Sequence, residues 1–183
     1  MRKVIMALCL ISAVVLTAWL KPVSNARKAP VAKEGIQWLT LQQAEEKNKK
    51  QEKPILIDLY TDWCGWCKVM DKQTYSDKQV AAYIMDKFYP VKLDAEQKQA
   101  IVFGGKTYQF NDAARTHDFA IYLTQGQLAY PTTVILPGEG NSPQAIAGFL
   151  KPKELEPIAK YFGEGQFGKI PFEEFSKKLK KSW

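Results

Sequence analysis

The sequence predicts an α/β protein whose mixed, mostly parallel central sheet carries helices on both faces. Residues 55–60 form an apolar run rich in β-branched and aromatic side chains and bounded by Pro54, which is typical of a buried strand. A helix is expected directly after it, and residues 89–93 form the next strand, expected to run parallel to the first. Residues 132–136 and 144–149 form two later strands, the last of them antiparallel.

The first 26 residues have the pattern of a secretory signal peptide. Residues 2–3 are basic, residues 4–20 are apolar, and residues 24–26 offer the small side chains of a cleavage site. An uncleaved N-terminal membrane anchor is the alternative, because the apolar run is only a little short for a membrane span. Both interpretations place the folded part outside the cytoplasm, most simply in the periplasm.

The remainder of the 183-residue chain is expected to form one domain at residues 36–183, after a linker at residues 27–35. Residues 36–39 fit a first short strand. Thr40 can cap a helix that runs to about Gln51. Nothing in the composition indicates a repeat or a low-complexity tract.

Helices are also expected later in the chain. Ser76 can cap a helix that places Val80 and Ile84 on one face. Residues 151–162 fit a helix that tolerates proline in its first turn, and residues 172–181 fit a last amphipathic helix.

Charge gives little support to a nucleic-acid-binding function. The net charge is +7, but part of it lies in the predicted signal segment. Many of the other lysines fall at residues 47–53 and 177–181, where lysine-rich helix faces are usually solvated. We therefore expect no nucleic-acid partner.

Cys64 and Cys67 lie where the helix after the first buried strand should begin, and this Cys-x-x-Cys spacing indicates a redox dithiol. Unpaired N–H groups at a helix N-terminus stabilise a thiolate, so Cys64 is the expected nucleophile. Cys67 lies about one turn deeper and is the expected resolving thiol. A structural zinc site would need four ligands, and haem attachment would need histidine where Lys68 stands, so we expect no metal and no cofactor.

Asp58 and the segment 63–68 resemble the active-site segment of thioredoxin-fold proteins. Residues 91–94 resemble the following strand of that fold, and residues 130–132 resemble its cis-proline loop. The resemblance covers roughly residues 36–162 and is closest to periplasmic thioredoxin-like proteins and the thioredoxin-like domain of thiol:disulfide interchange proteins. It implies a thioredoxin-like fold.

The resemblance also exposes two departures from the family pattern. The family implies a short link before the cis-proline loop, yet residues 95–129 intervene here and fit a small hairpin around Gly104-Gly105 followed by a helix capped by Asn111 or Asp112. This insertion either selects substrates or only lengthens the scaffold. The Gly65-Trp66 dipeptide replaces the Gly-Pro of thioredoxin, which leaves the redox potential open.

Asp58 interrupts an otherwise apolar strand, and a buried carboxylate is costly unless it has a use. Burial raises its pKa, so it could accept the proton of Cys67 when that thiol attacks. The resemblance implies the same role, and it implies that Lys92 faces Asp58 in an ion pair. The alternative is that Asp58 reaches solvent.

Four further residues are expected to bind substrate. Trp63 and Trp66 flank the dithiol as an apolar platform, although packing alone could explain Trp63. Pro131 before an apolar strand suggests a cis peptide bond, which would leave the backbone of Tyr130 free to bond an extended substrate. The alternative is an ordinary trans proline at the start of the strand.

Together these features predict an extracytoplasmic thiol:disulfide oxidoreductase that acts on protein cysteines, as a reductant because no histidine lies between the cysteines. The resemblance suggests a membrane thiol reductase as electron donor. The alternative is a binding or assembly module whose dithiol remains a structural disulfide.

Overall fold

The computed structural model describes residues 35–138 and 140–183, so the predicted signal and linker at residues 1–34 lie outside the described part. None of the described helices is long and apolar enough to cross a bilayer. In chain order the elements are α1 (Leu41–Asn48), β1 (Ile55–Tyr60), α2 (Gly65–Met70), the π-helical turn η1 (Asp71–Tyr75), α3 (Lys78–Lys87), β2 (Tyr89–Asp94), β3 (Ile101–Phe103), β4 (Lys106–Tyr108), β5 (Phe110–Asn111), β6 (Thr116–His117), α4 (Asp118–Leu123), β7 (Thr132–Leu136), β8 (Gln144–Ala147), α5 (Pro152–Gly163) and α6 (Phe172–Lys178).

The central sheet has the strand order β2-β1-β7-β8 and is mixed, as predicted. The expectation that it is mostly parallel is wrong, because β1–β2 is its one parallel strand pair and β7 runs antiparallel to both β1 and β8. The short connection between β7 and β8 explains part of this, since neighbouring strands joined by a tight turn must be antiparallel. The predicted strand at residues 36–39 is reduced to a bridge between Leu39 and Val91.

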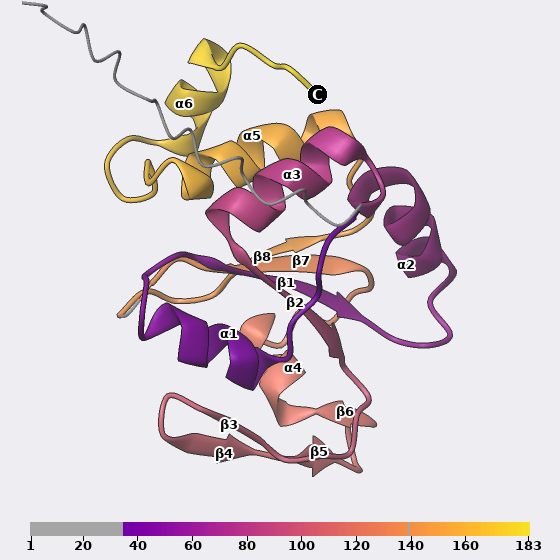
Figure 1. The fold of residues 1–183 in the computed structure, drawn as a ribbon. Coiled ribbons are helices and arrows are strands. Elements are labelled where there is room, and N and C mark those ends of the chain that lie inside the picture. Colours follow the sequence, from indigo (N-terminus) through magenta and orange to yellow (C-terminus); the bar gives the residue numbers. More distant parts are fainter. Residues whose placement is uncertain (1–34, 139) are drawn as a thin grey trace, which may run out of the picture. The chain divides into compact units, whose positions relative to one another are not determined.

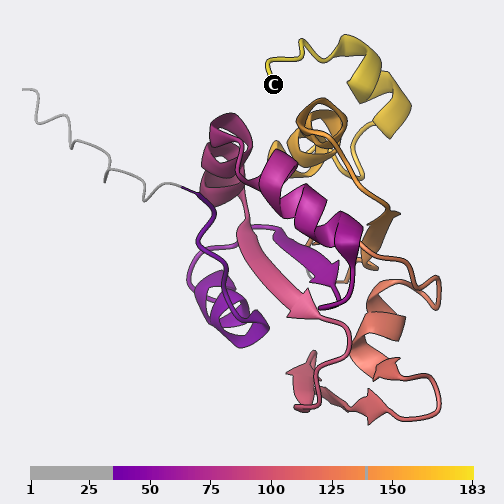
Figure 2. The same cartoon turned by 90° about the vertical axis from the view of Figure 1, so that its right-hand side faces the viewer.

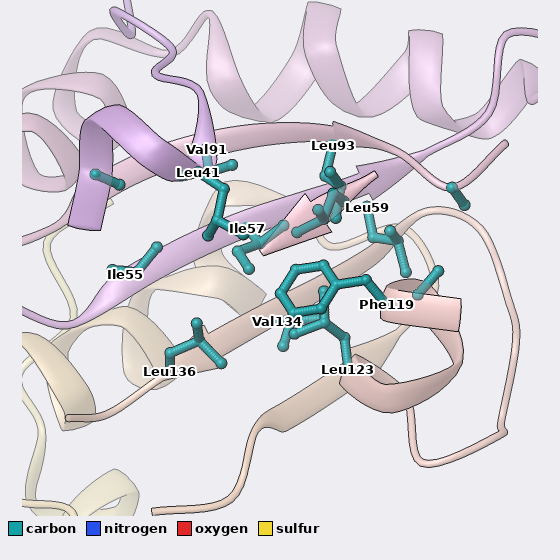
Figure 3. Close-up of a cluster of buried hydrophobic side chains, with 14 of the residues drawn as sticks. Leu41, Ile55, Ile57, Leu59, Val91, Leu93, Phe119, Leu123, Val134 and Leu136 are labelled. Atoms are coloured by element: carbon teal, nitrogen blue, oxygen red, sulfur yellow. The ribbon is translucent and has the colours of Figure 1, made fainter. Parts of the chain in front are cut away.

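Helices cover both faces of this sheet (Figures 1 and 2). Because side chains alternate along a strand, Ile57 and Leu59 of β1 point toward α1 and α4, where they join an apolar cluster (Figure 3). Leu56 points the other way, into a second cluster with side chains of α2, α3 and α5. Asp58 follows Leu56 by two residues and therefore lies on this second face.

Local capping explains where the first helices begin. The Thr40 hydroxyl oxygen accepts a hydrogen bond from the Gln43 amide, and the Gln43 side-chain oxygen accepts one from the Thr40 amide, so the predicted cap of α1 is confirmed. The expected cap of α3 is wrong by one residue. Asp77 accepts from the amides of Gln79 and Val80, whereas the Ser76 hydroxyl donates back to the carbonyl oxygen of Lys72.

The insertion between β2 and β7 contains the predicted hairpin, formed by β3 and β4 around two glycines with positive φ. The helix expected from Asn111 or Asp112 begins later. Asn111 accepts a hydrogen bond from the Ala114 amide, and Arg115 has a φ of 53°, so the chain turns back as the ribbon β5–β6. His117 then caps α4, accepting from the amide of Phe119.

Candidate active site

The two cysteines close a disulfide at the start of α2, with their Cα atoms 5.4 Å apart. Cys64 is the N-cap residue, and its Sγ accepts a hydrogen bond from the Cys67 amide at 3.0 Å. That amide is one of the donors a helix leaves unpaired at its N-terminus. After reduction the same donor is placed to stabilise a Cys64 thiolate.

Exposed aromatic rings flank a covered disulfide. Cys64 and Cys67 are each 4% exposed, whereas Trp63 and Trp66 are 67% and 63% exposed. Trp66 stacks on Phe149, which follows β8, with ring centroids 5.7 Å apart. These rings form an apolar surface around the sulfur atoms.

The insertion reaches this surface at Trp63. The indole Nε1 of Trp63 donates a hydrogen bond to Glu96 at 3.0 Å, and its ring meets Tyr130 edge-on at 5.9 Å. The Tyr130 hydroxyl lies 3.4 Å from the hydroxyl of Thr116, which donates to the carbonyl oxygen of Ala95. The insertion therefore supports both the residue before Cys64 and the loop before β7.

The Tyr130–Pro131 peptide bond is cis. The residue after this bond is anchored to β8, because the Pro131 carbonyl oxygen accepts a hydrogen bond from the Gly148 amide, next to the end of that strand, at 2.8 Å. The contact between Tyr130 and Trp63 brings this loop beside the dithiol, although Tyr130 lies 66 positions after Cys64 in the sequence.

Asp58 of β1 is buried, with only 1% of its surface exposed. Its Oδ2 lies 3.1 Å from Lys92 Nζ, as the resemblance to thioredoxin-fold proteins implied, and its Oδ1 has no hydrogen-bond partner among the described residues. Burial raises the pKa of Asp58 to about 6 and the nearby charge of Asp71 adds to the rise, while Lys92 limits it. A carboxyl group of this kind can gain or lose a proton near neutral pH.

Lys92 connects Asp58 to the end of α2. Its ammonium group also pairs with Asp71, the residue that ends α2 one turn after Cys67, so Asp58 lies close below the turn that holds the resolving cysteine. Burial acts to lower the pKa of Lys92, but the two carboxylates outweigh it and raise that pKa. Lys92 also lines a groove of about 810 Å³ with Tyr60 and Gln97, so the lysine of this ion pair is partly exposed whereas Asp58 is covered.

The site thus links Asp58, through Lys92, to the end of the helix that begins at Cys64, and brings Tyr130 against Trp63 beside the dithiol. Sequence reasoning missed Asp71, Glu96 and Phe149. The position of Asp71, one helical turn after Cys67, was a usable signal. Glu96 and Phe149 depend on tertiary contacts that no local pattern indicates.

Metal ligands and the single histidine are the remaining candidates for a site among the described residues. They contain no group of three or more potential ligands that could hold a metal ion. His117 is buried, with Nδ1 accepting from the Phe119 amide and Nε2 lying 3.1 Å from the Gln99 carbonyl oxygen, so it holds the insertion together.

Sequence comparison identifies related proteins. The family model Thioredox_DsbH, described as a protein of unknown function, DUF255, matches residues 27–156. The thiol:disulfide interchange protein DsbD of Escherichia coli strain K12 is 35% identical over 100 residues, which are 54% of this chain and 15% of that protein. DsbD of Shigella flexneri serotype 5b matches to the same extent. The chain therefore matches only a small part of these relatives.

Structure comparison finds the same fold. A structure titled DsbH Oxidoreductase has a TM-score of 0.53 at 20% identity and covers 74% of this chain and 90% of its own. A thioredoxin-fold protein from Helicobacter pylori has a TM-score of 0.50 at 14% identity, over 69% of this chain and 79% of its own. At such identities these structures establish the thioredoxin-like fold alone.

Proposed function

The chain belongs to the Thioredox_DsbH family, and on that basis we propose that it is a thiol:disulfide oxidoreductase acting on protein cysteines through Cys64 and Cys67. The observation that carries the proposal is the cysteine pair at the start of α2 with a buried carboxyl group beneath it. The names of the DsbD relatives, thiol:disulfide interchange proteins, support the same chemistry.

In the first step the reduced protein attacks a substrate disulfide. The Cys64 thiolate, stabilised by the Cys67 amide, bonds to one substrate sulfur and breaks the S–S bond. The other substrate sulfur leaves with the electron pair and takes a proton from water. The product is a mixed disulfide between Cys64 and the substrate.

In the second step Cys67 resolves this intermediate. Asp58 takes the proton of the Cys67 thiol, and the resulting thiolate attacks Cys64 Sγ. The bond between Cys64 and the substrate breaks, and the second substrate sulfur leaves as a thiolate that is then protonated. The substrate has gained two electrons and two protons, and the protein holds the Cys64–Cys67 disulfide.

Substrate binding is assigned to the surface around the sulfur atoms. Trp63 and Trp66 offer exposed apolar rings, which suit unfolded or partner chains with apolar side chains near the reacting cysteine. We infer that Tyr130 and Pro131 align an extended substrate segment beside Cys64, because Tyr130 contacts Trp63.

We propose that the protein works as a reductant outside the cytoplasm, in the periplasm. The absence of histidine between the cysteines supports the direction, and the signal-like pattern of residues 1–26 supports the location. Extracytoplasmic compartments are oxidising, so the disulfide must be reduced again by an electron donor. A membrane thiol reductase is the donor that fits this location.

Insulin reduction by the full chain, with dithiothreitol as electron source, tests the proposal. The wild-type protein should accelerate the reaction, and Cys64→Ser should reduce it to the background rate. Cys67→Ser should instead accumulate a mixed disulfide with the substrate, visible on a non-reducing gel. Trapping by Cys64→Ser would reverse the roles of the two cysteines.

One observation favours the alternative, a binding or assembly module with a structural disulfide. Both cysteines are almost fully covered, and a structural disulfide resists reduction. Thiol labelling after mild reduction separates the two functions. Rapid labelling of both cysteines supports catalysis, and resistance of the disulfide to dithiothreitol supports the structural role.

A further inference from the structure

Asp58 has one carboxylate oxygen that its surroundings do not satisfy. Lys92 holds Oδ2, while Oδ1 is buried and has no hydrogen-bond partner among the described residues. A buried charged oxygen needs a donor. The charged form of Asp58 is the form that accepts the Cys67 proton in the proposed function, so a donor for Oδ1 would bear directly on catalysis.

Tyr75 places a hydroxyl group on the same face of the sheet as Asp58, in the second apolar cluster. The π-helical turn η1 ends at Tyr75 and directs its ring into the core, where the residue is only 4% exposed. The hydroxyl has a long contact of 3.4 Å with the Thr133 hydroxyl, in which either group can donate. Thr133 lies directly opposite Asp58 in the antiparallel β1–β7 pair, so their side chains leave the same face as neighbours.

Electrostatics agree with this placement. Burial raises the pKa of Tyr75 well above its usual value, and the charge of Asp58 contributes to that rise. The other groups that face Asp58 are Lys92 on β2, Asp71 on η1 and Tyr60 at the end of β1, and of these Lys92 alone carries a donor that reaches Oδ2. The Tyr75 hydroxyl is therefore a neutral donor that lies against Thr133, the residue opposite Asp58, and whose pKa responds to the Asp58 charge.

We propose that Tyr75 is a positioning residue for Asp58, whose hydroxyl turns from Thr133 to donate a hydrogen bond to Oδ1 when the carboxylate is charged. This inference rests on the proposed function. A donor to the charged form makes that form easier to reach, so Tyr75 extends proton acceptance by Asp58 to lower pH. When Cys67 transfers its proton to Asp58, the Tyr75 hydroxyl returns to Thr133.

The test is Tyr75→Phe, which removes one oxygen and keeps the ring. The pKa of Asp58 is followed by carboxyl-carbon NMR titration of the full chain, and the pH profile of Cys67 attack by single-turnover reduction of insulin. Both midpoints should rise by about one pH unit, because the carboxylate loses a hydrogen bond. An unchanged or lowered NMR midpoint overturns the proposal.

Tyr83→Phe is the matched control. Its hydroxyl is also buried without a hydrogen-bond partner, but it lies on α3 and contacts Phe88 and Trp183, so the Asp58 titration should not change. An equal shift in both variants overturns the proposal, because it would show a general effect of losing a buried hydroxyl.

Thr133→Val gives a second test, in which the pKa of Asp58 should shift in the opposite direction. It removes the competing partner of Tyr75, so the pKa of Asp58 should fall, and an unchanged or raised pKa overturns the proposal even if Tyr75→Phe does not fold. The NMR titration needs no turnover. Failure of the proposed function would appear as absent insulin reduction with an intact Asp58 titration, and is thereby distinguished from failure of the Tyr75 role.

Discussion

The two faces of the central sheet differ in what β1 contributes to them. Toward α1 and α4, β1 directs Ile55, Ile57 and Leu59, all apolar and buried (Figure 3). Toward α2, α3 and α5 it directs Leu56 and then Asp58. The first face gains stability along its whole length. The second gives up stability at one end, where it holds a titratable group beneath the dithiol.

A truncation in the cluster on the apolar face should have the largest effect on stability of the substitutions considered below. Phe119 of α4 is fully buried and contacts the rings of Phe103 and Tyr108. Phe119→Ala should lower the free energy of unfolding by about 3–5 kcal/mol, through lost burial and the cavity left behind. Urea denaturation measures this loss. The redox midpoint should stay unchanged, and a change in it would contradict the separation of the two faces.

Removing the charge on the polar face should instead raise the free energy of unfolding. Because folding raises the pKa of Asp58 from 3.8 to about 6, the native state binds the proton more tightly than the unfolded state, and stability falls as pH rises through this range. Asp58→Asn should therefore raise the free energy of unfolding by about 2–3 kcal/mol above pH 6, and the gain should vanish below pH 4. Urea denaturation as a function of pH measures this difference.

The same variant should lose activity. Without the carboxylate, resolution of the mixed disulfide near pH 7 should slow by about 10²-fold, as expected for loss of a general base. In the wild type this rate should rise through pH 6 as Asp58 ionises, and in Asp58→Asn that rise should be absent. Wild-type rates in the variant would remove Asp58 from the mechanism.

Within the insertion, His117 should have an intermediate effect. His117→Ala removes the side-chain cap of α4 and the contact with the Gln99 carbonyl oxygen, and should cost about 1–2 kcal/mol. Hydrogen exchange of the α4 amides measures the local loss. His117→Asn is the control, because asparagine can cap a helix, and it should recover part of the protection.

The smallest effect is expected at the contact between the insertion and the dithiol loop. Glu96→Ala removes the acceptor of the Trp63 indole and should cost less than about 1 kcal/mol, since both side chains are partly solvated. The tryptophan fluorescence anisotropy should fall as Trp63 gains freedom. Glu96→Gln keeps an acceptor and should leave the anisotropy near the wild-type value.

Local sequence signals were sufficient where one pattern decides the structure. The apolar run of β1, the cysteine pair at the start of α2, and the hairpin glycines each specify their own element, and the structure contains all three. The ion pair between Asp58 and Lys92 was implied by resemblance to thioredoxin-fold proteins and lies where expected.

The cap of α3, the direction of β7 and two contacts at the site depend on tertiary structure and could not be predicted from local patterns. Asp77 displaces Ser76 as a helix cap because the π-helical turn extends to Tyr75 and shifts the start of α3. The direction of β7 is set by how the chain re-enters the sheet after the insertion, which periodicity does not encode. Tyr75 and Glu96 reach the site only through contacts between segments distant in sequence.

The redox equilibrium of the Cys64–Cys67 pair tests the central claim most directly. It is measured in defined mixtures of oxidised and reduced dithiothreitol or glutathione. A reversible midpoint near that of thioredoxin, about −270 mV, is the expected result for a reductant. A midpoint near about −120 mV would contradict the direction, and a disulfide that does not equilibrate at all would contradict thiol:disulfide exchange as the function.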